Sequence, residues 1–298
     1  MTSGFLPLSS DLYPQCKAYL ASREYCCVAL TAAFLEAGQP DKSGWQRSSF
    51  IVLVAAQGTA TPDIAGILHV TPGGTLLHLL DSPARVEPFR SQIAQWLANR
   101  TLHCILGTAT ETRFLESVIP RPLERTVDYE LMTLGAEPAE EMEKLPMLPE
   151  SVFRKREHLH IRRIHPGDAE LLLPLQLGYE EEEVLAPGKT PDKNQCLLTF
   201  RAALSRQEVY AVFHGKTPVC KAGTNARGLY WDQLGGIYTA PGFRSKGIAS
   251  ALVAHVVRRR IRQGRKTVLF VKTGNLSAKS VYGKVGFIRQ NDFRIVYF

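Results

Sequence analysis

The residues with the clearest chemical potential lie between Leu234 and Val257, in the segment LGGIYTAPGFRSKGIASALVAHVV. The pattern predicts a strand, a turn at Ala240–Gly242 and a helix that opens near Gly247. The first N–H groups of such a helix have no intrahelical acceptor, and glycine lets a ligand approach the backbone. With the charges of Arg244 and Lys246, this predicts a phosphate site. For this segment alone, an ordinary strand-to-helix turn is the alternative.

A second block follows one predicted helix-strand unit later and reads NLSAKSVYGKVGF, from Asn275 to Phe287. Together the two blocks resemble the GNAT superfamily of acyl-CoA N-acyltransferases. The first contains R-x-x-G-x-A, which is similar to the pyrophosphate loop of that family, and the second contains N-x-x-A-x-x-x-Y-x-x-x-G-F, which is similar to its later helix motif. The resemblance covers about residues 159–298, and the stretch GGIYTAPGFRSKGIASALV most resembles the FR47-like and glycine N-acyltransferase-like branch.

The resemblance implies a binding site for acetyl-CoA or another acyl-CoA. It implies that one strand runs along the acyl and pantetheine portion with the backbone groups of Ile237, Tyr238 and Thr239. It implies that the pyrophosphate is held by the amides of Arg244, Ser245, Lys246, Gly247, Ile248 and Ala249. Asn275 would contact the pantetheine arm, and Tyr282 would lie beside the thioester sulfur, where a phenol can donate a proton to the leaving thiolate. A core aromatic residue is the other interpretation of Tyr282.

The activity that the resemblance implies is transfer of an acetyl or other acyl group to an amine of a small molecule or a protein. The amine would attack directly in a ternary complex, with backbone donors of the strand stabilising the oxyanion. The general base stays open, because the strand Gln233–Ile237 has no carboxylate and Asp232 lies one residue outside it. Glu180–Glu183 would either line the acceptor site or form a solvated helix end. The acceptor and the acyl chain length also stay open.

The charge of the chain is divided unevenly between its halves. Residues 1–150 hold 11 Lys and Arg against 17 Asp and Glu, whereas residues 151–298 hold 25 against 11, so the net charges are −6 and +14. A basic half indicates an anionic partner. The alternative function is therefore a non-catalytic CoA-binding or nucleic-acid-binding regulatory module on the same fold. The run Arg258–Arg260 is expected to complement the negative end of a helix, so we do not expect nucleic acid as a partner.

Composition sets outer bounds on the protein. With 298 residues, 45% hydrophobic and 21% charged, the chain predicts two globular domains. Six cysteines without a C-x-x-C pair predict neither a disulfide framework nor a metal site, and they favour a reducing compartment. No apolar run reaches membrane-spanning length and no secretory signal is visible, so a cytoplasmic protein without a membrane partner is expected. The sequence leaves the oligomeric state open.

The elements that must position these residues form an α+β fold of tandem GNAT-like domains, each with a mixed central sheet flanked by helices. We expect a degenerate domain over residues 1–135, a Pro- and Glu-rich linker over 136–157 and the catalytic domain over 158–298. Both halves are predicted to run strand, strand, strand, helix, strand, helix, strand, which indicates a duplication. Leu12–Ala37 is expected to be one helix, and Phe293–Tyr297 the closing strand.

The N-terminal half has the same order of elements but lacks the site. Asp81–Pro88 follows its third strand and contains acids and prolines, with no glycine at the position equivalent to Gly247. Leu115 occupies the position that corresponds to Tyr282. We therefore expect this half to bind no CoA and to help shape the acceptor cleft.

Overall fold

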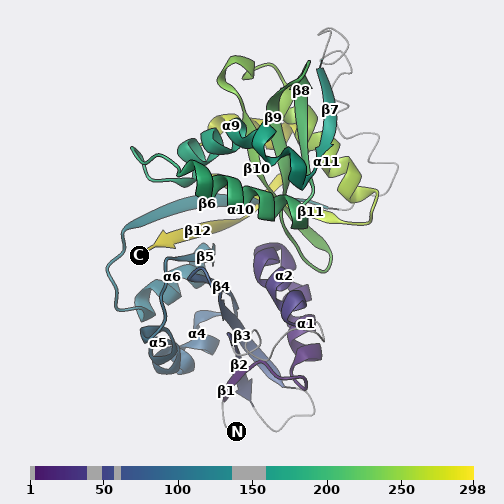
Figure 1. The fold of residues 1–298 in the computed structure, drawn as a ribbon. Helices are drawn as coiled ribbons and strands as arrows, with labels where there is room; N and C mark the ends of the chain where they lie inside the picture. The colour runs from purple at the N-terminus through teal and green to yellow at the C-terminus, as the bar shows by residue number, and fades with distance from the viewer. Residues whose placement is uncertain (1–3, 39–48, 57–61, 136–158) are drawn as a thin grey trace.

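The computed structural model describes residues 4–38, 49–56, 62–135 and 159–298 (Figure 1). The expected linker, residues 136–157, lies outside these ranges, and the domain boundaries on either side of it stay predictions. Both halves contain a strand, two helices and three strands, followed by helical segments that alternate with two further strands. The common order expected from the sequence is therefore present in the fold.

The N-terminal half contains six strands and helical segments between them. Its elements are β1 (Gly4–Pro7), α1 (Tyr13–Ser22), η1 (Glu24–Cys26), α2 (Val28–Ala37), β2 (Phe50–Ala56), β3 (Asp63–Val70), β4 (Thr75–Leu80), α4 (Pro83–Val86), η2 (Glu87–Phe89), α5 (Arg90–Ala98), β5 (Cys104–Thr108), α6 (Ala109–Val118) and β6 (Arg125–Leu134). The C-terminal half repeats this arrangement with β7 (Leu159–Ile164), η3 (Pro166–Asp168), α9 (Ala169–Tyr179), η4 (Glu180–Val184), α10 (Lys193–Arg206), β8 (Val209–His214), β9 (Thr217–Arg227), β10 (Trp231–Thr239), η5 (Pro241–Phe243), α11 (Ile248–Ile261), β11 (Lys266–Lys272), α12 (Leu276–Val285) and β12 (Ile288–Tyr297).

The expected helix Leu12–Ala37 is two helices, so that prediction was wrong. The break is the short η1, at which Glu24 is fully buried. The Glu24 carboxylate accepts hydrogen bonds from the backbone N–H groups of Leu229 and Tyr230, more than 200 residues away. A contact this distant in sequence has no signature in helical periodicity.

The strands form one continuous sheet, not a separate sheet in each half. Its order is β1-β2-β3-β4-β5-β12-β6-β11-β10-β9-β8-β7. The last strand of each half is exchanged: β12 pairs antiparallel with β5, and β6 pairs antiparallel with β11. Figure 1 shows β6 and β12 side by side between the two halves. Each half therefore depends on the other for the strand that completes its part of the sheet.

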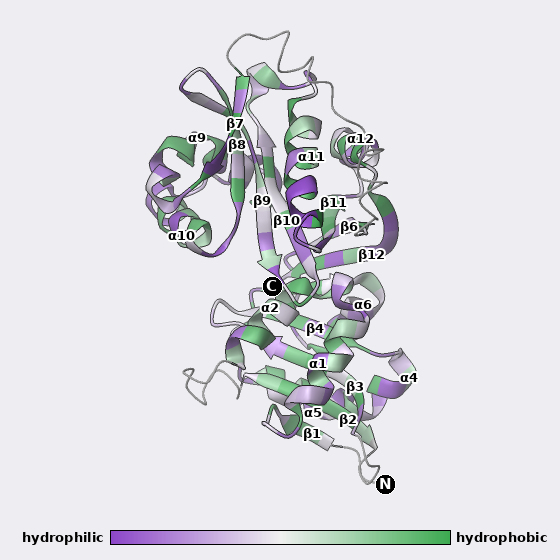
Figure 2. Cartoon of the chain, turned by 90° about the vertical axis from the view of Figure 1, so that its right-hand side faces the viewer, coloured by the Kyte–Doolittle hydropathy of each residue, from purple (hydrophilic) through white to green (hydrophobic). Residues whose placement is uncertain are grey.

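The hydrophobic core also includes residues from both halves of the chain. One cluster joins α1 and α2 residues such as Leu20 and Phe34 to Val268 of β11 and Phe293 of β12. A second cluster packs α11 and α12 onto the C-terminal strands. Figure 2 shows α11 changing from hydrophobic to strongly hydrophilic residues along its length. Because one cluster contains buried residues of both halves, the two halves share a core.

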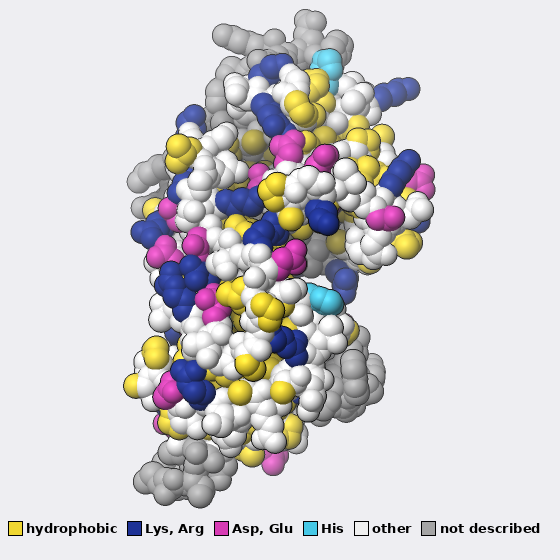
Figure 3. All heavy atoms as spheres, turned by 90° about the vertical axis from the view of Figure 1, so that its left-hand side faces the viewer, with side chains coloured by type: hydrophobic (Ala, Val, Ile, Leu, Met, Phe, Trp, Pro, Cys, Tyr) yellow, Lys and Arg dark blue, Asp and Glu magenta, His cyan; other side chains and the backbone are white. Residues whose placement is uncertain are grey.

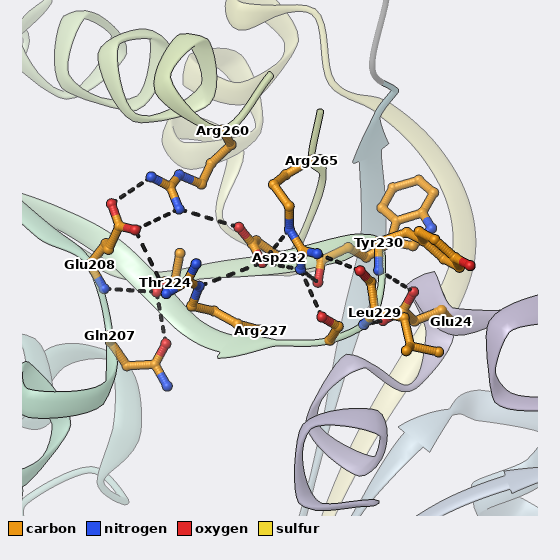
Figure 4. A network of polar contacts seen from close by, with 12 residues as sticks. Glu24, Gln207, Glu208, Thr224, Arg227, Leu229, Tyr230, Asp232, Arg260 and Arg265 are labelled. Carbon is orange, nitrogen blue, oxygen red and sulfur yellow. Dashed lines mark hydrogen bonds and ion pairs between the residues drawn. The ribbon is translucent and has the colours of Figure 1, made fainter. Parts of the chain in front are cut away.

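A buried polar network also connects the halves (Figure 4). Arg260, at the end of α11, is fully buried and donates to the Glu208 carboxylate at 2.9 Å. Its guanidinium also lies 3.5 Å from Asp232, which is ion-paired with Arg265 at 2.6 Å. Arg265 and Glu24 both bind the backbone of the turn between β9 and β10. Arg260 is therefore part of an internal ion-pair network. The sequence predicted that Arg258–Arg260 would complement the negative end of a helix, and this prediction does not account for Arg260.

Candidate functional site

The site is organised around a separation of two parallel strands. Strand β10 pairs with β11 only through Trp231, Asp232 and Gln233, and beyond Gln233 these two described strands no longer pair with each other. At the same place β10 has a bulge against β9, where Gly235 and Tyr238 face Gly223 and Lys221. The bulge includes Gly236 at φ 60°, a left-handed conformation that favours glycine. Backbone polar groups of β10 therefore face an opening in the sheet.

The loop that follows β10 has an unusual backbone conformation at the start of α11. Ser245 and Gly247 both have left-handed backbones, at φ 57° and 76°. The first helical bond of α11 runs from Ala251 N–H to the Gly247 carbonyl, at 3.0 Å. The N–H groups of Ile248 and Ala249 consequently have no intrahelical acceptor. Successive N–H groups in such a loop, at the positive end of a helix, favour phosphate.

The two cations of the loop are held by local contacts. Arg244 donates from Nε to the Thr239 carbonyl at 2.9 Å, and its Nη2 forms an ion pair with Glu182 at 2.8 Å. Lys246 donates to the Gly242 carbonyl at 2.6 Å. Because the Arg244 and Glu182 side chains are 44% and 43% exposed, the ion pair is accessible to solvent. An incoming pyrophosphate would compete with Glu182 for Arg244.

The acidic run is a π-helical turn, η4, that lies across the open ends of the two strands. Glu182 accepts from the Tyr238 hydroxyl of β10 at 2.7 Å. Glu183 is ion-paired with Lys272 at the end of β11, at 3.1 Å, and accepts from Asn275 at 3.3 Å. These two carboxylates connect η4 to both sides of the separation. Glu182 is 43% exposed and Glu180 of the same run lines a pocket, so both interpretations of the acidic run stay predictions.

The residues of the second sequence block lie on and before α12. Asn275 is the N-cap of this helix, and its side chain accepts from Ala278 N–H at 3.0 Å. Tyr282 is 7% exposed and packs edge-on against Phe287. Burial, with smaller contributions from Tyr179 and Glu183, raises the pKa of Tyr282 well above its ordinary value. The phenol is therefore protonated at neutral pH.

Two acidic candidates on or near β10 are excluded as free bases. Asp232 is part of β10, not outside it as the sequence suggested, and it is fully buried in the ion pair with Arg265. Glu208 is held by Arg260; although burial alone would raise its pKa, the hydrogen bonds from Arg260 leave that pKa below its ordinary value. Both carboxylates have structural partners.

A pocket and a buried lysine, neither predicted from the sequence, lie on the other side of the bulge. The pocket has a volume of about 320 Å³ and lies between α9, α10 and the strands β9 and β10. Its lining includes Lys221, Tyr179, Glu180, Arg206 and Gly236. Lys221 lies between Cys220 and Ala222 in the continuously buried middle of β9, so the signal that was available was a lysine within an apolar strand segment.

The N-terminal half has the same strand separation, but side chains fill it. Strand β4 pairs with β5 only from Thr75 to Leu77. The next residue, His78, is buried between Glu111 and Thr112, with 3.2 Å from one ring nitrogen to each side chain. Glu111 also accepts from Leu80 N–H at 2.8 Å. That this half binds no CoA stays a prediction.

Known proteins share this architecture at low sequence identity. Residues 220–295 match the family model described as FR47-like protein. A Drosophila protein has a TM-score of 0.63 at 13% identity, covering 99% of this chain and 98% of its own. A tandem GNAT protein from the clavulanic acid biosynthesis pathway has a TM-score of 0.58 at 10% sequence identity, and the match covers 99% of this chain and 98% of that protein. A GNAT family acetyltransferase from Colwellia psychrerythraea has a TM-score of 0.54 at 12% sequence identity, and the match covers 100% of both chains. None of the curated proteins matches the chain.

The fold is that of a tandem GNAT protein, an α+β architecture with a mixed sheet and flanking helices. Residues 220–295, which contain both sequence blocks, are similar to the FR47-like family model. The resemblance found in the two sequence blocks is thereby confirmed. The roles of the individual site residues stay predictions.

None of the helices within residues 4–38, 49–56, 62–135 and 159–298 is long and apolar enough to cross a membrane. Over the same ranges, no three His, Cys, Asp or Glu side chains form a group that would hold a metal ion. All six cysteines are free thiols.

Proposed function

We propose that the protein is an acyl-CoA-dependent N-acyltransferase that passes an acetyl or other acyl group to an amine while both substrates are bound. The observation that carries this proposal is the left-handed loop at Gly247, which follows the part of β10 that no longer pairs with β11. The loop offers N–H groups to a pyrophosphate, and the open strand offers backbone groups to an extended arm. Such a pair of features fits a long ligand with phosphates at one end.

The residues of the chain divide the chemistry between them. Bound acyl-CoA supplies an activated thioester carbonyl. Backbone donors near Gly236 and Ile237 would face the negative charge that develops on the carbonyl oxygen. Tyr282 would give its proton to the sulfur as the thiol leaves. The raised pKa keeps the phenol protonated but makes it a weaker acid, so this role rests on the position of Tyr282 in the second sequence block and not on its pKa.

Tyr282→Phe is expected to slow acyl transfer by about 10²- to 10⁴-fold, the usual contribution of a positioned general acid. Its affinity for CoA should change little, because the ring and its packing against Phe287 are retained. Thiol release from acetyl-CoA with an amine measures the rate, and calorimetry measures CoA affinity. Tyr230→Phe is the matched control, since that side chain is 58% exposed. Equal rates for both variants would exclude Tyr282 as the acid.

Glu182→Gln is expected to tighten CoA binding, because Glu182 and the pyrophosphate would compete for Arg244. An exposed ion pair is worth about 0.2–1 kcal/mol, so the dissociation constant should fall by about 1.5- to 5-fold. Arg244→Ala should weaken binding less than a change at Gly247, because backbone amides make most of the proposed contact. Calorimetric titration with CoA measures both. Weaker binding by Glu182→Gln would show that Glu182 positions Arg244 for the ligand.

The alternative function is a non-catalytic CoA-binding or nucleic-acid-binding module. It was suggested by the lack of a carboxylate in Gln233–Ile237 and by the basic charge of residues 151–298. On the face in Figure 3, Lys and Arg side chains are interspersed with acidic ones and form no continuous basic patch. Arg260 and Arg265 are occupied by Glu208 and Asp232. DNA binding that falls steeply with salt, without thiol release from acetyl-CoA, would favour this alternative.

A further inference from the structure

Lys221 is a buried amine in a place where the proposed reaction needs a proton acceptor. It is 2% exposed, and its Nζ donates to the Gly236 carbonyl in the β10 bulge at 2.7 Å. It lines the 320 Å³ pocket together with the bulge residues Gly235 and Gly236. One atom of the chain therefore touches both the pocket and the strand along which the thioester is proposed to lie.

Burial is the feature of Lys221 that disfavours its charge, because it removes the water that would solvate an ammonium. The rings of Tyr179 and Phe200, 4.5 Å and 5.7 Å from Nζ, and the Gly236 carbonyl attract the charged form and offset part of this effect. Burial lowers the pKa of Lys221 to about 7, and the attraction of Glu180 on η4 offsets only part of that effect. Cys220 on its own strand and Cys196 on α10 also lie near it, and each would favour the charged form only as a thiolate.

Four other carboxylates near the site are bound to cationic partners, whereas Glu180, which lines the same pocket, accepts from the neutral amide of Gln176 at 2.8 Å. Asp232 and Glu208 bind Arg265 and Arg260, and Glu182 and Glu183 bind Arg244 and Lys272. Cys220 is buried, and burial raises the pKa of its thiol to about 11, so it is neutral at pH 7. Lys221 differs from all of these in that a neutral amine keeps a lone pair while one N–H still donates to Gly236.

We propose that Lys221 is the proton acceptor for the amine substrate, which enters the pocket between α9, α10 and the β10 bulge. This inference rests on the proposed acyltransferase function and supplies the general base that the sequence left open. The amine nitrogen forms a bond to the acyl carbon, the carbon–sulfur bond breaks, and its electron pair stays on sulfur. The amine proton goes to Nζ of Lys221, and the sulfur takes a proton from Tyr282. Exchange with water restores both side chains.

The kinetic test is the pH dependence of thiol release from acetyl-CoA, with β-alanine, benzylamine and spermidine as acceptor probes. For the wild type we expect kcat/KM to rise with pH through an apparent pKa of about 7, shared by every probe that reacts. Lys221→Met should lose this rise and react at least about 100-fold more slowly at pH 8, which is the lower end of general-base effects. Its CoA affinity should be unchanged.

The second readout is thermal stability, which needs no substrate. Because the lowered pKa makes folded Lys221 release its proton near pH 7 while the unfolded chain holds it to about 10.5, the wild type should gain stability between these pH values. Lys221→Met should melt at a higher temperature than the wild type at pH 7, and this difference should shrink as the pH rises. Lys216→Met, an exposed lysine on the same hairpin, is the control for both readouts.

The outcomes separate the two proposals. If the wild type releases no thiol with any probe, the proposed function fails and the role of Lys221 with it. If the wild type is active and Lys221→Met keeps both the rate and the rise with pH, only the role of Lys221 is wrong. A melting difference that does not vary with pH would likewise overturn it, because folded Lys221 would then titrate as an ordinary lysine. Lys221→Gln repeats the test with a polar replacement.

Discussion

Gly247→Val is expected to weaken CoA binding by about 100-fold or more. A β-branched side chain disfavours the left-handed φ of 76° and would intrude where the pyrophosphate meets the N–H groups of Ile248 and Ala249. Each hydrogen bond to a charged group contributes about 1.5–3 kcal/mol, so losing two of them removes at least a factor of 100. Calorimetric titration should give one CoA per wild-type chain, because His78 and Glu111 fill the corresponding position in the other half.

The control for this variant lies at the other end of the same helix. Gly264 has a φ of 70°, and a β-carbon there would meet no other atom within 4 Å. Gly264→Val therefore introduces similar backbone strain far from the loop, and it should leave CoA binding intact. If Gly247→Val is folded and binds CoA as tightly as the control, the assignment of the pyrophosphate loop is wrong.

Arg260→Met is expected to lower the free energy of unfolding by about 3–5 kcal/mol, the usual cost of removing one partner from a buried ion pair. The change leaves the buried carboxylates of Glu208 and Asp232 without the guanidinium between them. Urea unfolding measures the loss. Arg259→Met is the matched control, because Arg259 is exposed and stacks over Tyr210, and it should change the free energy by less than about 1 kcal/mol.

The pH dependence of stability gives an independent check on this network. Because the pKa of Glu208 is lowered in the folded state, its contribution is present above the ordinary pKa of 4.5 and is lost as the pH falls below it. Arg260→Met should therefore lose less stability than the wild type on acidification over that range. Equal losses for the two proteins would mean that Glu208 does not depend on Arg260.

Local patterns in the sequence were sufficient for most elements. The helix expected to open near Gly247 is α11, which begins at Ile248. The strand, turn and helix around Gly247 were also predictable, because a left-handed glycine before a helix depends on neighbouring residues only. The closing strand is longer than Phe293–Tyr297, since β12 begins at Ile288 and pairs with both β5 and β6.

The sequence by itself determined the GNAT-like order of elements, the FR47-like signature and the asymmetry between an acidic half and a basic half. Only the tertiary structure decided the exchange of β6 and β12, the buried partners of Glu24 and Arg260, and the position of Lys221 beside the bulge. The physical reason is the range of the interactions. Hydrophobic periodicity and turn chemistry act over a few residues, whereas burial of a charge depends on side chains that the chain brings together from distant segments.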